Sequence, residues 1–407
     1  MKFNKWTIGL IATGVVSLGS AARADEGPIS TLVSGTTISG AVDTSAQWKT
    51  GSGSTMANRF ISTAPDHYNG INLNYFEFRI EKPLDEAQWS AGYKAEMWFG
   101  QDANGLPGSL SDGVAVKQAY VSLRAPVGNG LDFKIGQVDP IIGYEVASSY
   151  ANPNFSRSMG FWIEPFSHTG VLASYQLTEW FGMVGGVADT TFGKMNTKED
   201  WSYGPGSPNT YNNPKGDGTL TYMGALTLKA PESWGWLAGS SLYGGLVDGG
   251  VSGGPDTMNY YAGLSMPTPI KEITVGASWD YLSDHTFDGQ WAQAIAGYVS
   301  YQLTEKMKLN ARVEYAKGNG TASGSGDRGG LWITPIDNIG YDSGASYPGA
   351  GGYNEKIFAV TGTLEYQLWD NVVSRLEGVW DHDLRGNDAF NGSNNAFLMV
   401  ANIAYKF

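Results

Sequence analysis

The stretch Phe397-Leu-Met-Val-Ala-Asn-Ile-Ala-Tyr-Lys-Phe407 decides the fold. Its odd positions, from Phe397 to Phe407, are almost all large and apolar or aromatic, whereas its even positions include Asn402 and Lys406. Side chains of a β-strand alternate between two faces, so this pattern places one face in an apolar medium and gives the other a mixed lining. Hydrocarbon cannot satisfy the polar edge of an open sheet, and the pattern therefore predicts a sheet that closes on itself.

The same alternation recurs along the chain. In 307–315, Leu309 and Val313 share one face, while Lys308 and Arg312 share the other. Strands are predicted near 36–48, 71–82, 89–100, 115–125, 131–138, 169–177, 180–189, 219–229, 236–247, 258–266, 272–282, 292–303, 306–316, 356–367, 371–381 and 396–407. The sequence thus predicts an all-β protein, a transmembrane antiparallel up-and-down barrel of about 16 strands.

Short and long connections alternate between these strands. The short ones lie at 83–86, 126–130, 231–233 and 267–269, and the long ones near 49–70, 102–114, 139–168, 190–218, 248–257, 283–291, 317–355 and 382–395. Outer-membrane barrels have short periplasmic turns and longer outer loops. With an even strand count, both termini are expected on the periplasmic side.

The composition agrees with one barrel domain. The chain has 56 glycines and 13% aromatic residues, which suits tight turns and aromatic girdles at the membrane interfaces. No linker divides the chain, so residues 25–407 are expected to form a single outer-membrane β-barrel domain. The net charge of −13 argues against nucleic acid as a partner, and the absence of cysteine excludes a thiolate metal site. No cofactor and no metal are predicted.

The first residues carry a secretion signal. Lys2 and Lys5 form a basic start, 6–18 are mostly apolar, and Ala22-Arg-Ala24 fits an A-x-A cleavage site. Residues 1–24 are therefore expected to be a cleaved signal peptide. The apolar run is too short for a transmembrane helix, and no later stretch reaches the roughly 20 apolar residues that such a helix needs.

Several motifs resemble one family of porins. They are Lys82-Pro-Leu-Asp-Glu86, Trp89-Ser-Ala-Gly-Tyr93, Ala119-Tyr-Val-Ser-Leu-Arg-Ala-Pro-Val-Gly-Asn-Gly130, Ile142-Gly-Tyr-Glu145, Asn152-Pro-Asn-Phe-Ser-Arg-Ser158, His168-Thr-Gly-Val-Leu-Ala-Ser-Tyr175 and Leu309-Asn-Ala-Arg312. The chain is similar in these segments to the OmpL-like β-barrel porins of the bacterial outer membrane. The resemblance implies a porin-like pore and no particular solute. A last strand ending at Phe407 also resembles the signal that the barrel-assembly machinery reads.

The 139–168 loop is the candidate constriction. In general porins the loop after the fifth strand folds inward, and 131–138 is the fifth predicted strand here. Large apolar residues such as Ile142, Phe155 and Trp162 would be unusual on a solvated loop. Its polar groups are expected at the narrowest point of the pore: Asp139, Glu145, Arg157, Glu164 and His168. The alternative is a loop that caps the rim.

Charged residues of the strands are expected to line the pore. A lipid-facing Arg or Lys costs about 2–4 kcal/mol at the bilayer midplane, so these side chains should face the lumen. The predicted wall set is Glu77, Arg79, Lys94, Glu96, Lys117, Arg124, Asp132, Lys134, Lys308, Arg312, Glu314, Glu365, Arg375 and Glu377. For any single residue, a cross-strand ion pair without a role in selectivity is the alternative.

Two other classes of function are known for outer-membrane barrels, enzymatic and structural or adhesive. An outer-membrane hydrolase needs a catalytic constellation, and Asp381-His382-Asp383 is the one tempting cluster. The chain has no G-x-S-x-G elbow and no H-E-x-x-H motif, so it is not expected to be an enzyme. A structural or adhesive barrel would use the loops at 190–218 and 317–355.

The sequence therefore predicts an outer-membrane porin with a water-filled channel for passive diffusion of small hydrophilic solutes and ions. Its expected partners are outer-membrane lipid, the barrel-assembly machinery and those solutes. By analogy with general porins, which are typically trimers, a homotrimer is a candidate assembly.

Overall fold

The computed structural model describes residues 35–50, 59–61, 69–85, 87–106, 108–111, 113–189, 220–250, 256–284, 291–318, 355–386, 390 and 393–407. The strands are β1 (Thr37–Thr50), β2 (Asn69–Lys82), β3 (Ala91–Phe99), β4 (Ser109–Ser111), β5 (Val114–Ala125), β6 (Leu131–Val138), β7 (His168–Gln176), β8 (Phe181–Ala188), β9 (Thr221–Lys229), β10 (Ser241–Gly250), β11 (Asp256–Pro267), β12 (Ile273–Asp284), β13 (Trp291–Gln302), β14 (Met307–Gly318), β15 (Glu355–Trp369), β16 (Val372–Asp383) and β17 (Asn395–Lys406). The helices are α2 (Met159–Ile163) and the 3₁₀ turns η3 (Gln101–Gly105), η4 (Ser149–Ala151) and η5 (Glu232–Leu237).

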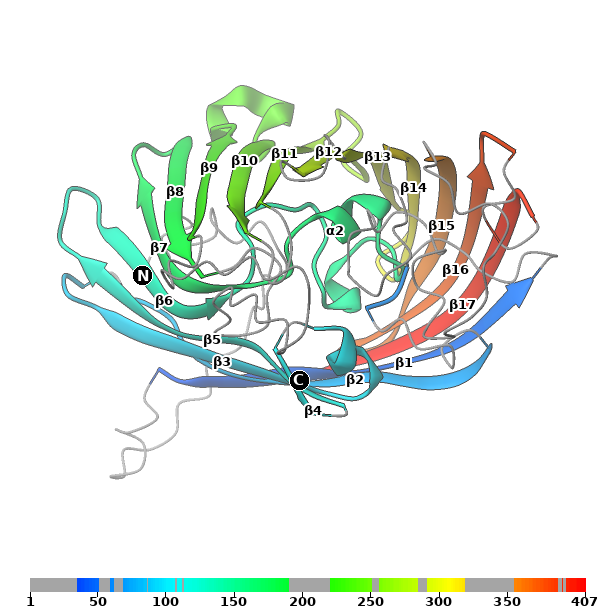
Figure 1. Ribbon diagram of the computed structural model, residues 1–407, viewed down its shortest axis with the longest axis horizontal. Helices are drawn as coiled ribbons and strands as arrows, with labels where there is room; N and C mark the ends of the chain where they lie inside the picture. The colour runs from blue at the N-terminus through cyan, green and yellow to red at the C-terminus, as the bar shows by residue number, and fades with distance from the viewer. Residues whose placement is uncertain are drawn as a thin grey trace, which may run out of the picture.

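Within these residues, sixteen antiparallel strands close into a barrel (Figure 1). Each strand pairs with its neighbours in the chain, and β17 returns to β1 with Ala41 opposite Lys406. The three-residue β4 pairs with β5 alone and lies in the connection between β3 and β5, which pair directly with each other. The predicted fold and strand number are confirmed.

The two faces of the wall follow the alternation of the sequence. In β17, Met399 is 57% exposed on the outer face, whereas its neighbour Leu398 is 1% exposed on the inner face. The inner face also holds Asn402, which donates to Asp43 of β1 across the closing seam at 3.0 Å. The outer face therefore suits lipid, and polar side chains are directed inward.

One predicted strand boundary is wrong. The strand expected at 236–247 is β10, which begins only at Ser241, because the preceding residues form a longer turn that includes η5. Gly235 and Gly239 there have φ of 63° and 83°, a left-handed conformation that glycine adopts without steric cost. Trp234 and Trp236 are exposed on this turn, as expected of aromatic rings at a membrane interface.

The core lies inside the barrel. The segment 139–167, between β6 and β7, is called the inner loop here, and its helix α2 lies within the ring of strands (Figure 1). Phe155, Met159 and Ile163 of this loop pack with wall residues in one apolar cluster. The wall contributes small side chains there, including Ala294 and Ala316, which leave room for α2.

Two predictions concern residues outside the described part of the chain. The signal peptide at 1–24 lies outside it, as do most of the loops at 190–218 and 317–355. Among the residues that are described, no helix is long and apolar enough to cross a membrane.

Candidate functional site: the inner loop and its clamp

The inner loop contacts strands on opposite parts of the barrel. At one end of the loop, Tyr243 of β10 donates to the carbonyl of Ile141. Further along, the Ser149 amide donates to the Tyr75 hydroxyl of β2 at 3.1 Å, and the Ser149 hydroxyl donates to Asp43 of β1. The loop thus crosses the lumen from β10 to the neighbouring strands β1 and β2.

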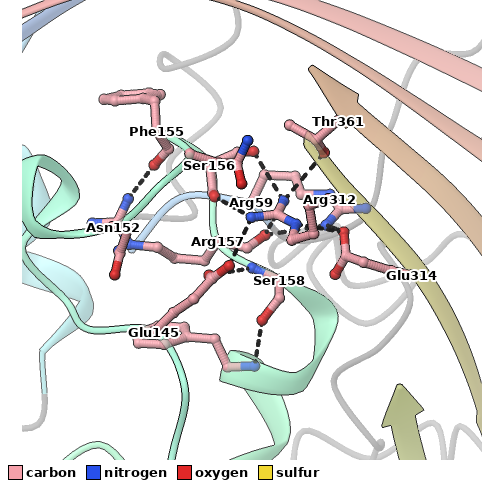
Figure 2. Close-up of polar contacts among 12 residues, drawn as sticks. Arg59, Glu145, Asn152, Phe155, Ser156, Arg157, Ser158, Arg312, Glu314 and Thr361 are labelled. Carbon is pink, nitrogen blue, oxygen red and sulfur yellow. Dashed lines mark hydrogen bonds and ion pairs between the residues drawn. The ribbon is translucent and has the colours of Figure 1, made fainter. Parts of the chain in front are cut away.

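Five charged side chains hold the middle of the loop, and they are called the clamp: Arg59, Glu145, Arg312, Glu314 and Asp381. Arg312 of β14 binds Glu145 of the loop at 2.9 Å through Nη1, and Glu314 at 2.9 Å through Nε (Figure 2). Arg59 binds the same Glu314 oxygen, Oε2, at 2.7 Å and also pairs with Asp381 of β16. All five side chains are at most 1% exposed.

The clamp also satisfies backbone groups of the loop. Arg312 donates to the Ser156 carbonyl at 2.6 Å, and Arg59 donates to the Arg157 carbonyl at 3.1 Å. Glu314 accepts from the Met159 amide at 2.7 Å, where α2 begins. The peptide groups of a buried loop have no adjacent strand to bond with. Charged side chains of the wall therefore supply the hydrogen bonds that these groups need.

A second set of contacts lies on β16. Glu377 accepts from the amides of Phe155 and Ser156 at 2.6 and 2.9 Å. Arg375 donates to the carbonyls of Ser149 and Asn152 at 2.9 and 3.1 Å. These two oppositely charged neighbours on one strand face therefore bind the loop backbone by its donors and its acceptors.

A third set lies on β2. Glu77 accepts from the hydroxyls of Ser148 at 2.9 Å and Tyr150 at 3.1 Å. Glu77 is fully buried, and Arg79 pairs with it at 2.5 Å. The loop is consequently fixed to the wall on both sides of the lumen.

Two acids meet where α2 packs on β12. Glu164, just after α2, shares a hydrogen bond with Asp280, and both are buried. Gly160 and Gly143 lie against these carboxyl groups; a Cβ atom at either glycine would be 2.3 Å from a carboxylate oxygen. Burial, and next the Asp280 charge, raise the pKa of Glu164 well above its ordinary value.

We expect Glu164 to hold the inner loop less firmly at alkaline pH than at neutral pH. Because the folded-state pKa of Glu164 is raised, its contribution is complete below the unfolded pKa and is lost as pH rises through the folded value. Amide hydrogen exchange of the loop, corrected for its intrinsic pH dependence, should show less protection at alkaline pH. Glu164→Gln should remove most of that difference, and equal protection of the wild type at both pH values would contradict the expectation.

Gly143→Ala should destabilise the barrel by about 1–3 kcal/mol. Gly143 has φ of 123°, and an added methyl would meet Glu164. Gly378→Ala is the matched control, since Gly378 lies on the outer face of β16 and its Cβ would meet nothing within 4 Å. Urea unfolding of both variants in lipid vesicles measures the difference, and equal midpoints would show that the loop seat tolerates the methyl.

The predicted loop residues take a different orientation from the one expected. Glu145, Arg157, Glu164 and His168 are buried, with 2–5% of each whole residue exposed, rather than facing open space. Glu145 and Glu164 contact the wall. Arg157 donates to loop carbonyls, including that of Val146 at 3.2 Å. The reason is that the buried loop needs internal partners more than it needs a polar surface. Asp139, which binds Lys117 at 2.7 Å, is the part-exposed member of the five.

The predicted wall residues all lie on the inner face and divide into two groups. One group is buried: Glu77, Glu96, Lys117, Arg312, Glu314, Arg375 and Glu377. The other is half-buried: Arg79, Lys94, Arg124, Asp132, Lys134, Lys308 and Glu365. Most residues of the buried group bind the inner loop: Glu77, Arg312, Glu314, Arg375 and Glu377. The half-buried group therefore offers most of the charged surface that a solute could contact.

Sequence reasoning missed Arg59 and Asp381 as partners. They are separated by 322 residues, and Arg59 belongs to the long connection between β1 and β2. Asp381 had a signal, because it shares the inward face of β16 with Arg375 and Glu377. Arg59, which comes from the long connection between β1 and β2, had no such signal.

The side chains of Asp381, His382 and Asp383 do not come together into a catalytic cluster. Asp381 and Asp383 are buried on the inner face, whereas the intervening His382 bonds to Asn395 of β17 at 2.9 Å through Nδ1. Adjacent residues of a strand point to opposite faces, which separates the three groups. The described residues also include no group of three acids or histidines that could hold a metal ion.

A closed antiparallel barrel with an apolar outer face, a charged inner face and a loop held across its lumen is a barrel of the outer-membrane porin class. Comparison with family models identifies the family: residues 35–407 match the putative beta-barrel porin-2, OmpL-like family. The chain belongs to that family. The comparison with curated proteins found no match to this chain.

Solved structures share the fold at low sequence identity. The outer-membrane channel DcaP of Acinetobacter baumannii is 10% identical with a TM-score of 0.56, covering 91% of this chain and 97% of its own. The anion-selective porin of Comamonas acidovorans is 13% identical with a TM-score of 0.54, covering 91% and 99%. In-vitro folded OmpT of Vibrio cholerae, in its trimer form, is 12% identical with a TM-score of 0.53, covering 91% and 99%.

Proposed function

We propose that this protein is a passive diffusion channel for small hydrophilic solutes and ions. The observation that carries the proposal is the inner face itself: half-buried charges such as Arg79, Lys94 and Glu365 lie inside a barrel of sixteen strands, a size that can enclose an aqueous channel. Charged groups retain their hydration where water reaches them. The proposal contains no covalent step and no cofactor.

In this proposal the inner loop sets the width of the channel. It is fixed on both sides of the lumen, so a solute would pass beside it rather than push it aside. The five predicted loop residues then have three different positions. Asp139 faces the passage, whereas Glu145, Arg157 and Glu164 hold the loop in place and His168 begins β7 at its end.

The proposed setting is the bacterial outer membrane, with both termini in the periplasm and residues 1–24 removed during export. The position of Phe407 supports the proposal that it is part of the signal for the barrel-assembly machinery. Phe407 exchanges backbone hydrogen bonds of 3.0 Å with Gly40 at the closing seam, and the residue is 45% exposed. A homotrimer is proposed by analogy with OmpT, whose solved structure is a trimer form.

Liposome swelling tests this function. Vesicles containing the refolded chain should swell in neutral sugars at rates that fall steeply with sugar size, because diffusion through a narrow water-filled channel is limited by solute diameter. Refolding is checked independently by the heat-dependent shift of a barrel on an electrophoresis gel. Correctly folded barrels that admit none of the sugars would contradict the proposal.

A further inference from the structure

The inner wall carries three cations in adjoining positions: Arg79 of β2, Lys94 of β3 and Lys134 of β6. These strands lie side by side around the barrel together with β5 (Figure 1). In the strand register, Arg79 lies opposite Glu96 of β3, and Lys94 lies opposite Tyr120 of β5. Lys134 stands one step further round, with its Nζ 5.0 Å from the centre of the Tyr120 ring.

The acids that balance these cations lie behind them. Glu96 attracts Arg79 at 3.4 Å, Lys94 at 3.2 Å and Lys117 at 3.5 Å, so three cations converge on one carboxylate. The Glu96 and Glu77 side chains are 0% exposed, whereas those of Arg79 and Lys94 are 20% and 13% exposed. Water in the lumen therefore touches the positive groups and not the carboxylates that hold them.

Lys134 strengthens this asymmetry. Within the described part of the chain, no carboxylate lies within ion-pairing distance of its ammonium group, and Tyr120 is its neighbour instead. Three half-buried acids lie in this region: Glu81 is opposite Lys94 in register, Asp139 binds Lys117 at 2.7 Å, and Asp132 binds Arg124 at 2.6 Å. Because Asp139 and Asp132 are each bound to a further cation, Glu81 is the acid of these three that opposes Arg79, Lys94 and Lys134, and the surface is positive in balance.

We propose that Arg79, Lys94 and Lys134 form a binding site for small anionic solutes on the channel wall, so that the pore prefers anions. The inference rests on the proposed channel function and names the class of solute. A positive surface bordered by protein of low dielectric raises the local concentration of anions. Arg79 and Lys94 are fixed by buried carboxylates, and Lys134 lies over the Tyr120 ring, so the site needs little reorganisation when an anion arrives.

Reversal potentials in a potassium chloride gradient test the site. The wild type should favour chloride, and Lys94→Gln with Lys134→Gln should lower its chloride-to-potassium permeability ratio by about three-fold or more. Inorganic phosphate should reduce the chloride current of the wild type more than that of the variant. Lys271→Gln with Lys306→Gln is the matched control, because it makes the same charge change on exposed turns.

The outcomes separate this inference from the proposed function. An open wild-type pore that favours potassium, or a Lys94/Lys134 variant with the wild-type permeability ratio, would overturn the anion site and leave the channel. Wild-type barrels that are folded but carry no current would overturn the channel, and the anion site with it.

Discussion

Replacing residues 145–164 by a short Gly-Ser linker should raise the single-channel conductance by about two-fold or more. The replaced segment includes α2 and the loop residues that bind Arg312, Arg375 and Glu377, so its removal opens the lumen from β14 to β16. The strands keep their hydrogen-bond ladders, because no ladder passes through this segment. Planar-bilayer recordings of the refolded barrel measure the effect.

A matched change at the rim serves as the control. The turn 232–237 forms η5 and has no buried residue, so the same linker there should leave the conductance unchanged. If both variants keep the wild-type conductance, the inner loop does not narrow the channel, and a cap on the rim becomes the better account of it.

Arg312→Gln should release the inner loop and cost about 3–5 kcal/mol of stability. Arg312 is fully buried between Glu145 and Glu314, and its loss leaves two carboxylates without their shared partner. The expected signs are a lower unfolding midpoint in urea and a noisy current with frequent transitions to larger conductance levels. Quiet, wild-type currents at an unchanged midpoint would show that the clamp does not hold the loop.

Two further variants make this prediction specific. Lys308→Gln removes a positive charge from the same face of β14 and should be close to neutral, because Lys308 is half-buried outside the clamp. Glu145→Gln combined with Arg312→Gln should recover part of the lost stability, since the double variant no longer buries the unpaired Glu145 charge. A double variant less stable than the sum of the single variants would contradict this pairing.

The strands of the barrel could be predicted because each one is encoded locally. A strand with one face in lipid must alternate, and the predicted 306–316 and 131–138 correspond to β14 (Met307–Gly318) and β6 (Leu131–Val138). The error at β10 has a local cause as well. Gly235 and Gly239 turn the chain where the apolar spacing around Trp236 resembles a strand.

The clamp could be predicted only in part because it depends on distant segments. The position of the inner loop and its apolar residues pointed to an inward fold, and alternation placed Arg312 and Glu314 on the inner face. Burial of those charges follows from contacts with Glu145 and Arg59, which no local pattern encodes. The same charges on a wall without the loop would face water.

Single-channel recording of the refolded wild-type chain in a planar bilayer, with a potassium chloride gradient, tests the central claim most directly. The account predicts stable, ohmic current steps and a reversal potential of the sign that marks chloride preference. Silence from a barrel shown to be folded would contradict it, because the loop held by Arg312 and Arg59 would then close the lumen rather than narrow it.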